Sequence, residues 1–299
     1  MLTDSGHCKI AKALISSARE MFGADLRVTM EQFFTQVEFL RKLHIDLKID
    51  RGRVTRKYDK IRRLFFQAVG CLLEASTEGP QCVCTYHQAL ASALQAGDAV
   101  LTFNYDTLMD AALKARGGHW WRANDGYGVS IAGGADPWDS PKTRGKPCSR
   151  PIKLLKLHGS LNWEWDEISH SVTLTSSPYN PDKFLIIPPA VNKDITGHPV
   201  LNSVWKEARS ALRLARVILV IGYSVPETDL LAQALLRVDP AWERSKPLTH
   251  LILVNPEGQA RGDMVRLVAR AIDGATRVVW EDRFSDLVPL LASPGNEAT

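Results

Sequence analysis

Four short apolar runs of the sequence each end at a polar residue whose side chain could take part in chemistry. The polar residues that follow these runs are Asn104, His158, Ser224 and Asn255. Continuous apolar runs are typical of parallel strands that are buried on both faces. Ligands of open α/β sheets bind beyond the carboxyl ends of such strands, so we expect an amide, an imidazole, a hydroxyl and a second amide along one crevice.

Helices are expected before and between these strands. Thr29 and Gln32 make a capping box at the start of an apolar stripe with three- and four-residue spacing, which predicts a helix. A second stripe at residues 61–72 predicts another helix. From residue 98 onward, helix and strand patterns alternate. This order favours a Rossmann-like, doubly wound, mostly parallel α/β sheet with a helical N-terminal or inserted subregion.

The domain organisation is predicted from these patterns, because length alone allows one large domain or two small ones. We expect a single domain over residues 1–299, with a largely helical segment at 1–96 and the Rossmann-like core at 98–291. Residues 117–150 hold three tryptophans among many Gly, Pro and Ser residues. Loops of this length are usually functional or disordered, and the tryptophans favour a flap over a ligand crevice.

The composition is that of a well-packed protein, with 45% hydrophobic and 23% charged residues. No apolar stretch approaches the roughly 20 residues of a membrane span, and no signal core is present, so we expect a cytoplasmic protein without a membrane partner. The net charge is only +4, but basic residues crowd the stretch 48–63. A solvated helix face is the favoured interpretation, and direct nucleic-acid binding stays open.

Several common kinds of site are not supported. The sequence has no Walker-type phosphate loop, and Gly126-Tyr127-Gly128 lacks the third glycine and the strand-to-helix context of a dinucleotide fingerprint. It has no Gly-x-Ser-x-Gly elbow. The five cysteines and eight histidines show no framework or zinc-ligand spacing. We therefore expect no metal, no disulfide scaffold and no redox chemistry.

Taken alone, each strand-end residue has an ordinary structural interpretation. A strand-end asparagine more often caps a turn, and a single buried histidine is more often structural. Ser224, which precedes Val225-Pro226, could simply start a helix with Thr228 as its cap. A more specific indication of function is the order of four motifs along the chain. They are LTFNYD at 101–106, KLHGSLNW at 156–163, IGYSVPETD at 221–229 and LVNP at 253–256.

Together these motifs resemble the sirtuin-like (silent information regulator-like) domain family, over about residues 85–256. The resemblance is to the bacterial branch without a zinc module, which occurs in antiphage systems that deplete NAD. It implies that Asn104 and His158 are catalytic. It also implies that Asp106 shapes the nicotinamide pocket and that Asn255 contacts the adenosine ribose. The full set of implied NAD-binding residues is Thr102, Tyr105, Asp106, Gly222, Tyr223, Ser224, Asp229 and Asn255.

The residue types agree with cleavage of the nicotinamide–ribose bond. Nicotinamide leaves NAD+ as a neutral molecule, so the site needs no strong general acid, unlike an ordinary glycosidase. This accounts for the absence of an obvious Asp/Glu pair. An amide such as Asn104 can orient a ribose hydroxyl and a water, and a histidine such as His158 titrates in the useful range for a base.

The resemblance therefore implies an NAD+ glycohydrolase that uses NAD+ as substrate and acts in abortive infection. We expect a homo-oligomer, a defence-system partner such as a helicase-like ATPase or an Argonaute-like protein, or both. Two alternatives stay open: a non-catalytic NAD- or ADP-ribose-binding scaffold subunit, and an NAD-dependent protein deacylase. The deacylase ranks lower because the zinc-module cysteines are missing.

One feature of the family is not found in this sequence. Family members usually open with a strand that ends in Gly-Ala-Gly-x-Ser and binds diphosphate, whereas residues 10–21 here have a helical pattern. Loss of that strand would remove backbone N–H groups that bind diphosphate and would leave strand edges inside the sheet. Two interpretations stay open: the strand lies upstream of residue 1, or it is lost. Only its loss would favour the scaffold alternative.

Overall fold

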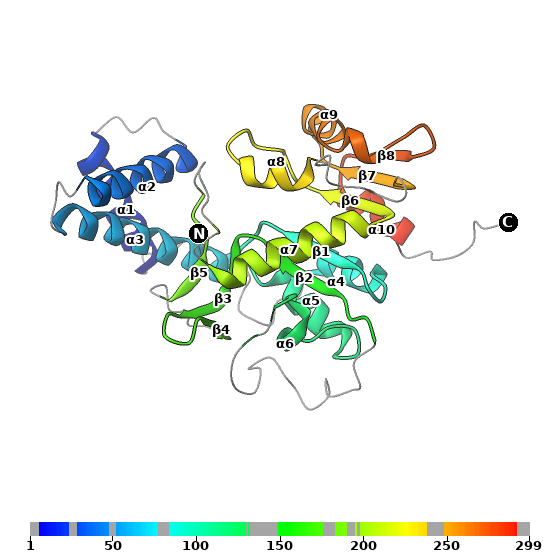
Figure 1. Cartoon of the computed structure of the whole chain (residues 1–299), viewed down its shortest axis with the longest axis horizontal. Coiled ribbons are helices and arrows are strands. Elements are labelled where there is room, and N and C mark those ends of the chain that lie inside the picture. The colour runs from blue at the N-terminus through cyan, green and yellow to red at the C-terminus, as the bar shows by residue number, and fades with distance from the viewer. Residues whose placement is uncertain are drawn as a thin grey trace.

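The computed structural model describes residues 6–23, 29–47, 52–76, 84–129, 131, 149–175, 183–189, 195, 198–237 and 248–291. Its elements are α1 (Gly6–Phe22), α2 (Met30–Asp46), α3 (Arg53–Ser76), α4 (Thr85–Ala93), β1 (Ala99–Thr102), α5 (Leu108–Arg116), α6 (Ala123–Gly126), β2 (Lys153–Lys156), β3 (Gly159–Asp166), β4 (Ser171–Leu174), β5 (Phe184–Ile186), α7 (Pro199–Leu214), β6 (Val217–Ile221), α8 (Leu230–Leu236), β7 (His250–Val254), α9 (Gly258–Leu267), η2 (Ala269–Ala271), β8 (Arg277–Glu281) and α10 (Phe284–Leu291). This order confirms the predicted Rossmann-like α/β class with parallel strands (Figure 1).

The first three helices form a bundle beside the sheets (Figure 1). The predicted capping box is confirmed, because the Thr29 N–H donates to Gln32 Oε1 at 3.0 Å and the Gln32 N–H donates to Thr29 Oγ1 at 3.2 Å. Inside the bundle, the rings of Phe34 on α2 and Phe65 on α3 have centroids 4.1 Å apart. The bundle therefore packs around an aromatic cluster that also includes residues of β3 and β5.

Some residues of the basic stretch at 48–63 form ion pairs within this bundle. Lys57 Nζ lies 2.6 Å from a carboxylate oxygen of Glu20 on α1, and Arg62 Nε lies 4.0 Å from one of Glu38 on α2. Pairs of this kind at a surface contribute little to stability. Lys48 and Arg51, at the start of the stretch, lie outside the described residues.

Parallel strands carry the predicted polar residues at their carboxyl ends. Within the described residues they form two sheets, β1-β2 and β6-β7-β8. In the first sheet Thr102 pairs with Lys156, and in the second Ile221 pairs with Val254. The predicted strand ends at these residues are thus confirmed, and the polar residues that follow leave the sheets at the same edge of each pair.

A third, antiparallel sheet has the order β4-β3-β5. The short strand β5 alternates between two apolar clusters, as the two-residue period of a strand dictates. Phe184 and Ile186 belong to the cluster of the helical bundle. Leu185, and Ile187 directly after the strand, belong to the main core. This strand therefore joins the two clusters.

Helix α7 packs against β1 and β2 and lies across the main core (Figure 1). Its buried residues Leu201, Val204 and Ala208 recur at three- and four-residue spacing. On the same helix, the Trp205 indole N–H donates to the carbonyl of Leu157 at 2.8 Å, directly before His158. In the part of the chain that the structure describes, no helix has the length and apolarity needed to cross a membrane.

The excursion at 117–150 is described only in part. Trp121 and Tyr127 are buried, and their rings make an edge contact at 5.3 Å, while Tyr127 makes another with Trp163 at 5.2 Å. This part of the excursion belongs to the core. The predicted flap falls mostly on residues outside the described part, Trp138 among them.

Candidate functional site

The register of β1 and β2 places the two predicted catalytic residues at equivalent positions. Thr102 pairs with Lys156, so Asn104 and His158 each lie two residues beyond a matched pair. The Leu157 N–H donates to the Thr102 carbonyl at 2.9 Å and extends the pairing by one residue. The amide and the imidazole thus leave neighbouring parallel strands at the same end, where ligands of such sheets bind.

His158 lies within a group of aromatic rings. Its ring centroid is 5.1 Å from that of Phe103, 6.4 Å from that of Tyr105 and 6.5 Å from that of Trp205. Only 5% of the residue is exposed. The two residues that flank Asn104 therefore both contact His158, and they fix the end of β1 against it.

Asp229 is the acidic neighbour of the imidazole. Its Oδ2 lies 3.8 Å from His158 Nε2, and the residue is only 3% exposed. Asp229 also caps α8, because its Oδ1 accepts from the Ala232 N–H at 3.4 Å. The expectation that Thr228 would cap a helix here is wrong, since α8 begins one residue later and its first free N–H groups face Asp229. Asp229 thus supplies a carboxylate beside the imidazole, on the side of the turn after β6.

Asn104 differs from His158 in its exposure. The residue is exposed, and its carboxamide hydrogen-bonds to no described residue. Its backbone N–H donates to Thr102 Oγ1 at 3.1 Å, which fixes the turn after β1. The predicted amide is therefore held by its backbone, while its side chain stays available to a ligand.

The other predicted residues of the β1 motif have structural partners. The Tyr105 hydroxyl donates to the Ile187 carbonyl at 2.7 Å. Asp106 Oδ1 accepts from the Leu108 N–H at 3.0 Å and closes an Asx turn just before α5, whose N-cap residue is Thr107. These contacts bind the Asn-Tyr-Asp turn to the residue after β5 on one side and to α5 on the other.

The turn after β6 has an unusual backbone. Gly222 has a φ of 65°, and a Cβ added there would meet no atom within 4 Å. Val225 has a φ of 52°, a strained value for a β-branched residue, above all before a proline. The exposed Ser224 lies between these two residues. Strain of this kind persists where the surrounding structure enforces it, and it is typical of ligand-binding turns.

Tyr223, in the same turn, joins β6 to the end of β1. Its ring stacks on that of Phe103 with centroids 5.0 Å apart and an interplanar angle of 27°. Among the described residues its buried hydroxyl has no hydrogen-bond partner. Burial raises the pKa of both Tyr105 and Tyr223, and the negative charges of Asp229 and Glu31 raise it further. A phenol without a partner at this point can donate to a ligand.

Asn255 links the turn after β6 to the segment that follows β7. Its Nδ2 donates to the Tyr223 carbonyl at 3.3 Å, and its Oδ1 accepts from the Glu257 N–H at 2.9 Å. Its carbonyl accepts from Arg261 at 2.7 Å. Because the residue is only 8% exposed, it holds the turn after β6 in place and offers little surface to a ribose.

A buried polar chain supports the site, and the sequence interpretation missed it. Lys156, which is 0% exposed, donates to the carbonyl of Asp106 and lies 3.0 Å from Asp110 Oδ2. The Tyr127 hydroxyl donates to Asp110 Oδ1. The Asn162 amide donates to the Tyr127 hydroxyl at 3.1 Å. A lysine inside the apolar run 152–157 was the available signal, because a buried charge requires a partner.

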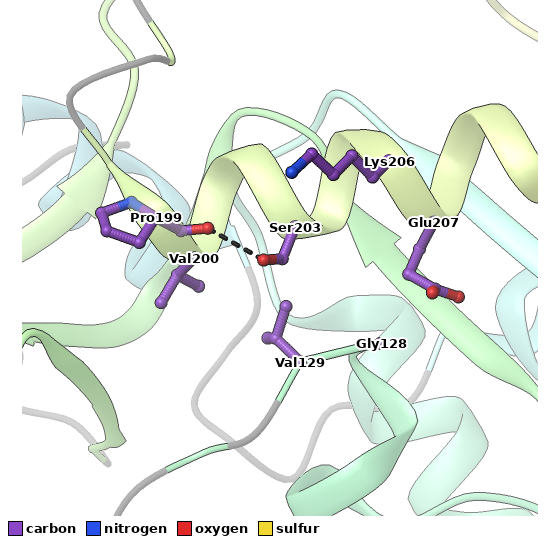
Figure 2. Close-up of a pocket in the computed structure, with 7 residues that line it drawn as sticks. All are labelled: Gly128, Val129, Pro199, Val200, Ser203, Lys206 and Glu207. Carbon is purple, nitrogen blue, oxygen red and sulfur yellow. Dashed lines mark hydrogen bonds between the residues drawn. The ribbon is translucent and has the colours of Figure 1, made fainter.

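A separate hollow of about 500 Å³ lies beside the first turns of α7 (Figure 2). It is lined by Gly128, Val129, Pro199, Val200, Ser203, Lys206 and Glu207. Ser203 Oγ donates to the Pro199 carbonyl at 3.0 Å, so this hydroxyl is used within the helix. The hollow shares no residue with the predicted strand-end site, whose aromatic partner on α7 is Trp205.

The arrangement brings an available amide, an imidazole with an acidic neighbour and a phenol that has no partner among the described residues to one end of the parallel strands. Among the described residues, no group of three His, Cys, Asp or Glu side chains is placed to hold a metal ion. The chemical groups that the site does offer are hydrogen-bond donors and acceptors, one base and buried negative charge.

Comparison with known proteins places the chain in a family. The model of the SIR2-like domain family matches residues 98–265, which is more than half of the chain. The matched span runs from the residue before β1 into α9, and it contains every predicted site residue. No curated protein matches the chain. The chain therefore belongs to the SIR2-like domain family, a family of NAD-utilising enzymes.

Proposed function

We propose that this protein is an NAD+ hydrolase that cleaves the nicotinamide–ribose bond. Water supplies the new bond to the anomeric carbon, the bond to the pyridinium nitrogen breaks, and nicotinamide leaves as a neutral molecule. The products are nicotinamide, ADP-ribose and a proton. The observation that carries the proposal is that His158 and its neighbour Asp229 lie beside the turn that holds Asn104, within a SIR2-like domain.

Each residue has a role in this proposal. The exposed carboxamide of Asn104 orients the attacking water and a ribose hydroxyl. His158 accepts the proton of that water, and Asp229 stabilises the imidazolium that results. Negative charge at this point also stabilises the oxocarbenium-like ribose of the transition state.

The proposal requires the side chains around His158 to move when substrate binds. Since only 5% of His158 is exposed and the rings of Phe103, Tyr105 and Trp205 surround it, side chains have to move before a ribose can reach the imidazole. This same burial favours a second candidate function, a non-catalytic NAD- or ADP-ribose-binding subunit. Calorimetry separates the two functions, because a scaffold subunit binds NAD+ and ADP-ribose without turnover.

The central experiment follows nicotinamide release from NAD+ by the full chain, alone and with its activator. We expect Asn104→Ala and His158→Ala each to reduce release by at least about 100-fold. Asn202→Ala on α7 and His250→Ala at the start of β7 are matched controls that remove the same groups elsewhere. Equal rates in the catalytic variants and the wild type would exclude the proposed roles.

We also propose the biological setting, which is depletion of NAD+ in abortive infection as part of antiphage defence. A hydrolase of this kind must be silent until it is triggered, so we propose a homo-oligomer, a helicase-like ATPase or Argonaute-like partner, or both. Cellular NAD+ measured after induced expression, with and without phage, tests this setting. Unchanged NAD+ under infection, with active purified protein, would contradict it.

In family members the Gly-Ala-Gly strand binds diphosphate, so the proposal must say which residues do so here. Among the described strands, β1 and β6 each have a single neighbour, so each offers a free edge. We propose that diphosphate binding falls to the turn at Gly222 and Ser224, whose backbone is exposed. If Gly222→Val weakens NAD+ binding no more than it weakens binding of nicotinamide alone, this assignment is wrong.

A further inference from the structure

A carboxylate from the helical bundle reaches the strand-end site. Glu31 lies in the first turn of α2, and the Thr228 hydroxyl donates to its Oε2. Thr228 directly precedes Asp229, which lies beside His158. The contact therefore joins two segments that are distant in the sequence, the start of α2 and the turn after β6.

The position of Glu31 is well defined. The capping box of Thr29 and Gln32 fixes the start of α2, and Thr35 Oγ1 donates to the Glu31 carbonyl at 2.6 Å. The residue is half-buried, so water screens its charge only in part. The backbone of Glu31 is thus held by the start of α2, and its carboxylate is held by the Thr228 hydroxyl.

Glu31 and Asp229 act on the same two phenols. Both carboxylates add to the effect of burial in raising the pKa of Tyr105 and of Tyr223. The ring of Tyr105 faces His158, and that of Tyr223 stacks on Phe103. The two carboxylates therefore lie within electrostatic reach of the aromatic rings around His158.

We propose that Glu31 is a specificity-determining residue of this site, which recognises the positive charge of a pyridinium ring. This inference rests on the proposed function, and it identifies the pyridinium ring as the part of the substrate that Glu31 of the helical bundle recognises. A cationic ring among aromatic side chains and two carboxylates is stabilised by both. ADP-ribose lacks the nicotinamide ring, and in NADH that ring is uncharged, so neither gains from Glu31.

The experiment measures the preference for NAD+ over NADH as a ratio of dissociation constants, in an Asn104→Ala background that prevents turnover. Glu31→Gln keeps an acceptor for Thr228 but removes the charge, and we expect it to lower the preference about fivefold. Glu31→Asp keeps the charge and should retain most of the preference. Glu38→Gln, on the same helix but paired with Arg62, is the matched control and should change nothing.

The outcomes separate this inference from the proposed function. If the wild type releases nicotinamide but Glu31→Gln weakens NAD+, NADH and ADP-ribose equally, Glu31 is only structural and the inference is overturned. If the wild type releases none, yet Glu31→Gln lowers the preference, the hydrolase proposal fails and the recognition of the cation stands. If the protein binds neither dinucleotide, both are overturned.

Discussion

At the scale of single residues, Asp229 has two tasks that one substitution can separate. It caps α8 through Ala232, and it lies 3.8 Å from His158. Asparagine caps helices as well as aspartate but carries no charge. We predict that Asp229→Asn changes the free energy of unfolding by less than about 1 kcal/mol and lowers nicotinamide release by at least about tenfold.

The measurement combines urea unfolding with the release assay. Asp229→Ala is the companion variant, which loses both tasks and should cost about 1 kcal/mol more in stability than Asp229→Asn. A fully active Asp229→Asn protein would show that the carboxylate does not serve His158.

The two tyrosines of the site should respond in opposite ways to loss of their hydroxyls. Tyr223 has a buried hydroxyl without a described partner, so Tyr223→Phe should raise the free energy of unfolding by about 1 kcal/mol at neutral pH. Tyr105 donates to Ile187, so Tyr105→Phe should lower it by about 1 kcal/mol. Chemical denaturation of the two variants checks the signs, and equal effects would contradict the assignment.

The pH dependence of stability follows from the same two phenols. Burial, then the charges of Asp229 and Glu31, raise the pKa of both tyrosines above the ordinary value of 10.0. The folded state therefore keeps phenol protons that the unfolded state loses, so this contribution is complete below pH 10 and is lost as the pH rises from there towards the raised values. We predict a shallower alkaline decline for Tyr223→Phe than for the wild type, measured by urea unfolding between about pH 9 and 11.

The residues named from motifs fall into two groups once their contacts are known. The strand-end positions of Asn104 and His158 were predictable, because a polar residue that ends an apolar run leaves the sheet at its carboxyl edge. The contact of Asn255 with the turn after β6 and the buried partner of Lys156 could not be predicted. Both depend on residues from distant parts of the chain. Glu31 was missed because it belongs to a helix whose sequence pattern indicates only packing.

At the scale of secondary-structure elements, Gly159 at the start of β3 and Gly222 after β6 have different reasons to be glycine. A Cβ on Gly159, at a φ of 81°, would lie 1.9 Å from the Leu185 carbonyl oxygen of β5. Gly222, at a φ of 65°, has open space around it. We predict that Gly222→Ala costs about 1 kcal/mol through backbone strain alone, whereas Gly159→Ala costs at least about 3 kcal/mol because β5 must move.

Thermal unfolding of the two variants makes this comparison. At Gly222 the cost comes from the local backbone, whereas at Gly159 it comes from a tertiary contact. Equal losses of stability in the two variants would mean that the approach of β5 to Gly159 is not tight.

The sequence indicated the periodicity of the helices and the apolar runs of the strands, but it did not indicate the approach of β5 to Gly159. The pairing of β5 with β3, and the division of the parallel strands into two sheets, depend on contacts between distant segments.

At the scale of the whole molecule, the cluster of the helical bundle is completed by the sheets. Phe184 and Ile186 of β5 and Leu161 of β3 are buried in that cluster, while Leu185 of the same strand lies in the main core. Separation of the two regions would expose apolar area on both. We therefore propose that residues 1–299 are one folding unit.

This proposal gives a calorimetric prediction. The chain should unfold in one transition whose calorimetric and van't Hoff enthalpies agree. Phe184→Ala should lower the free energy of unfolding by about 3 kcal/mol and move that whole transition down by several degrees, because the cavity opens between the two clusters. Leu214→Ala, at a position that is 71% exposed, is the control and should leave it in place. Two transitions, of which Phe184→Ala moves only one, would show that the helical bundle folds by itself and that Glu31 reaches the site from a separate unit.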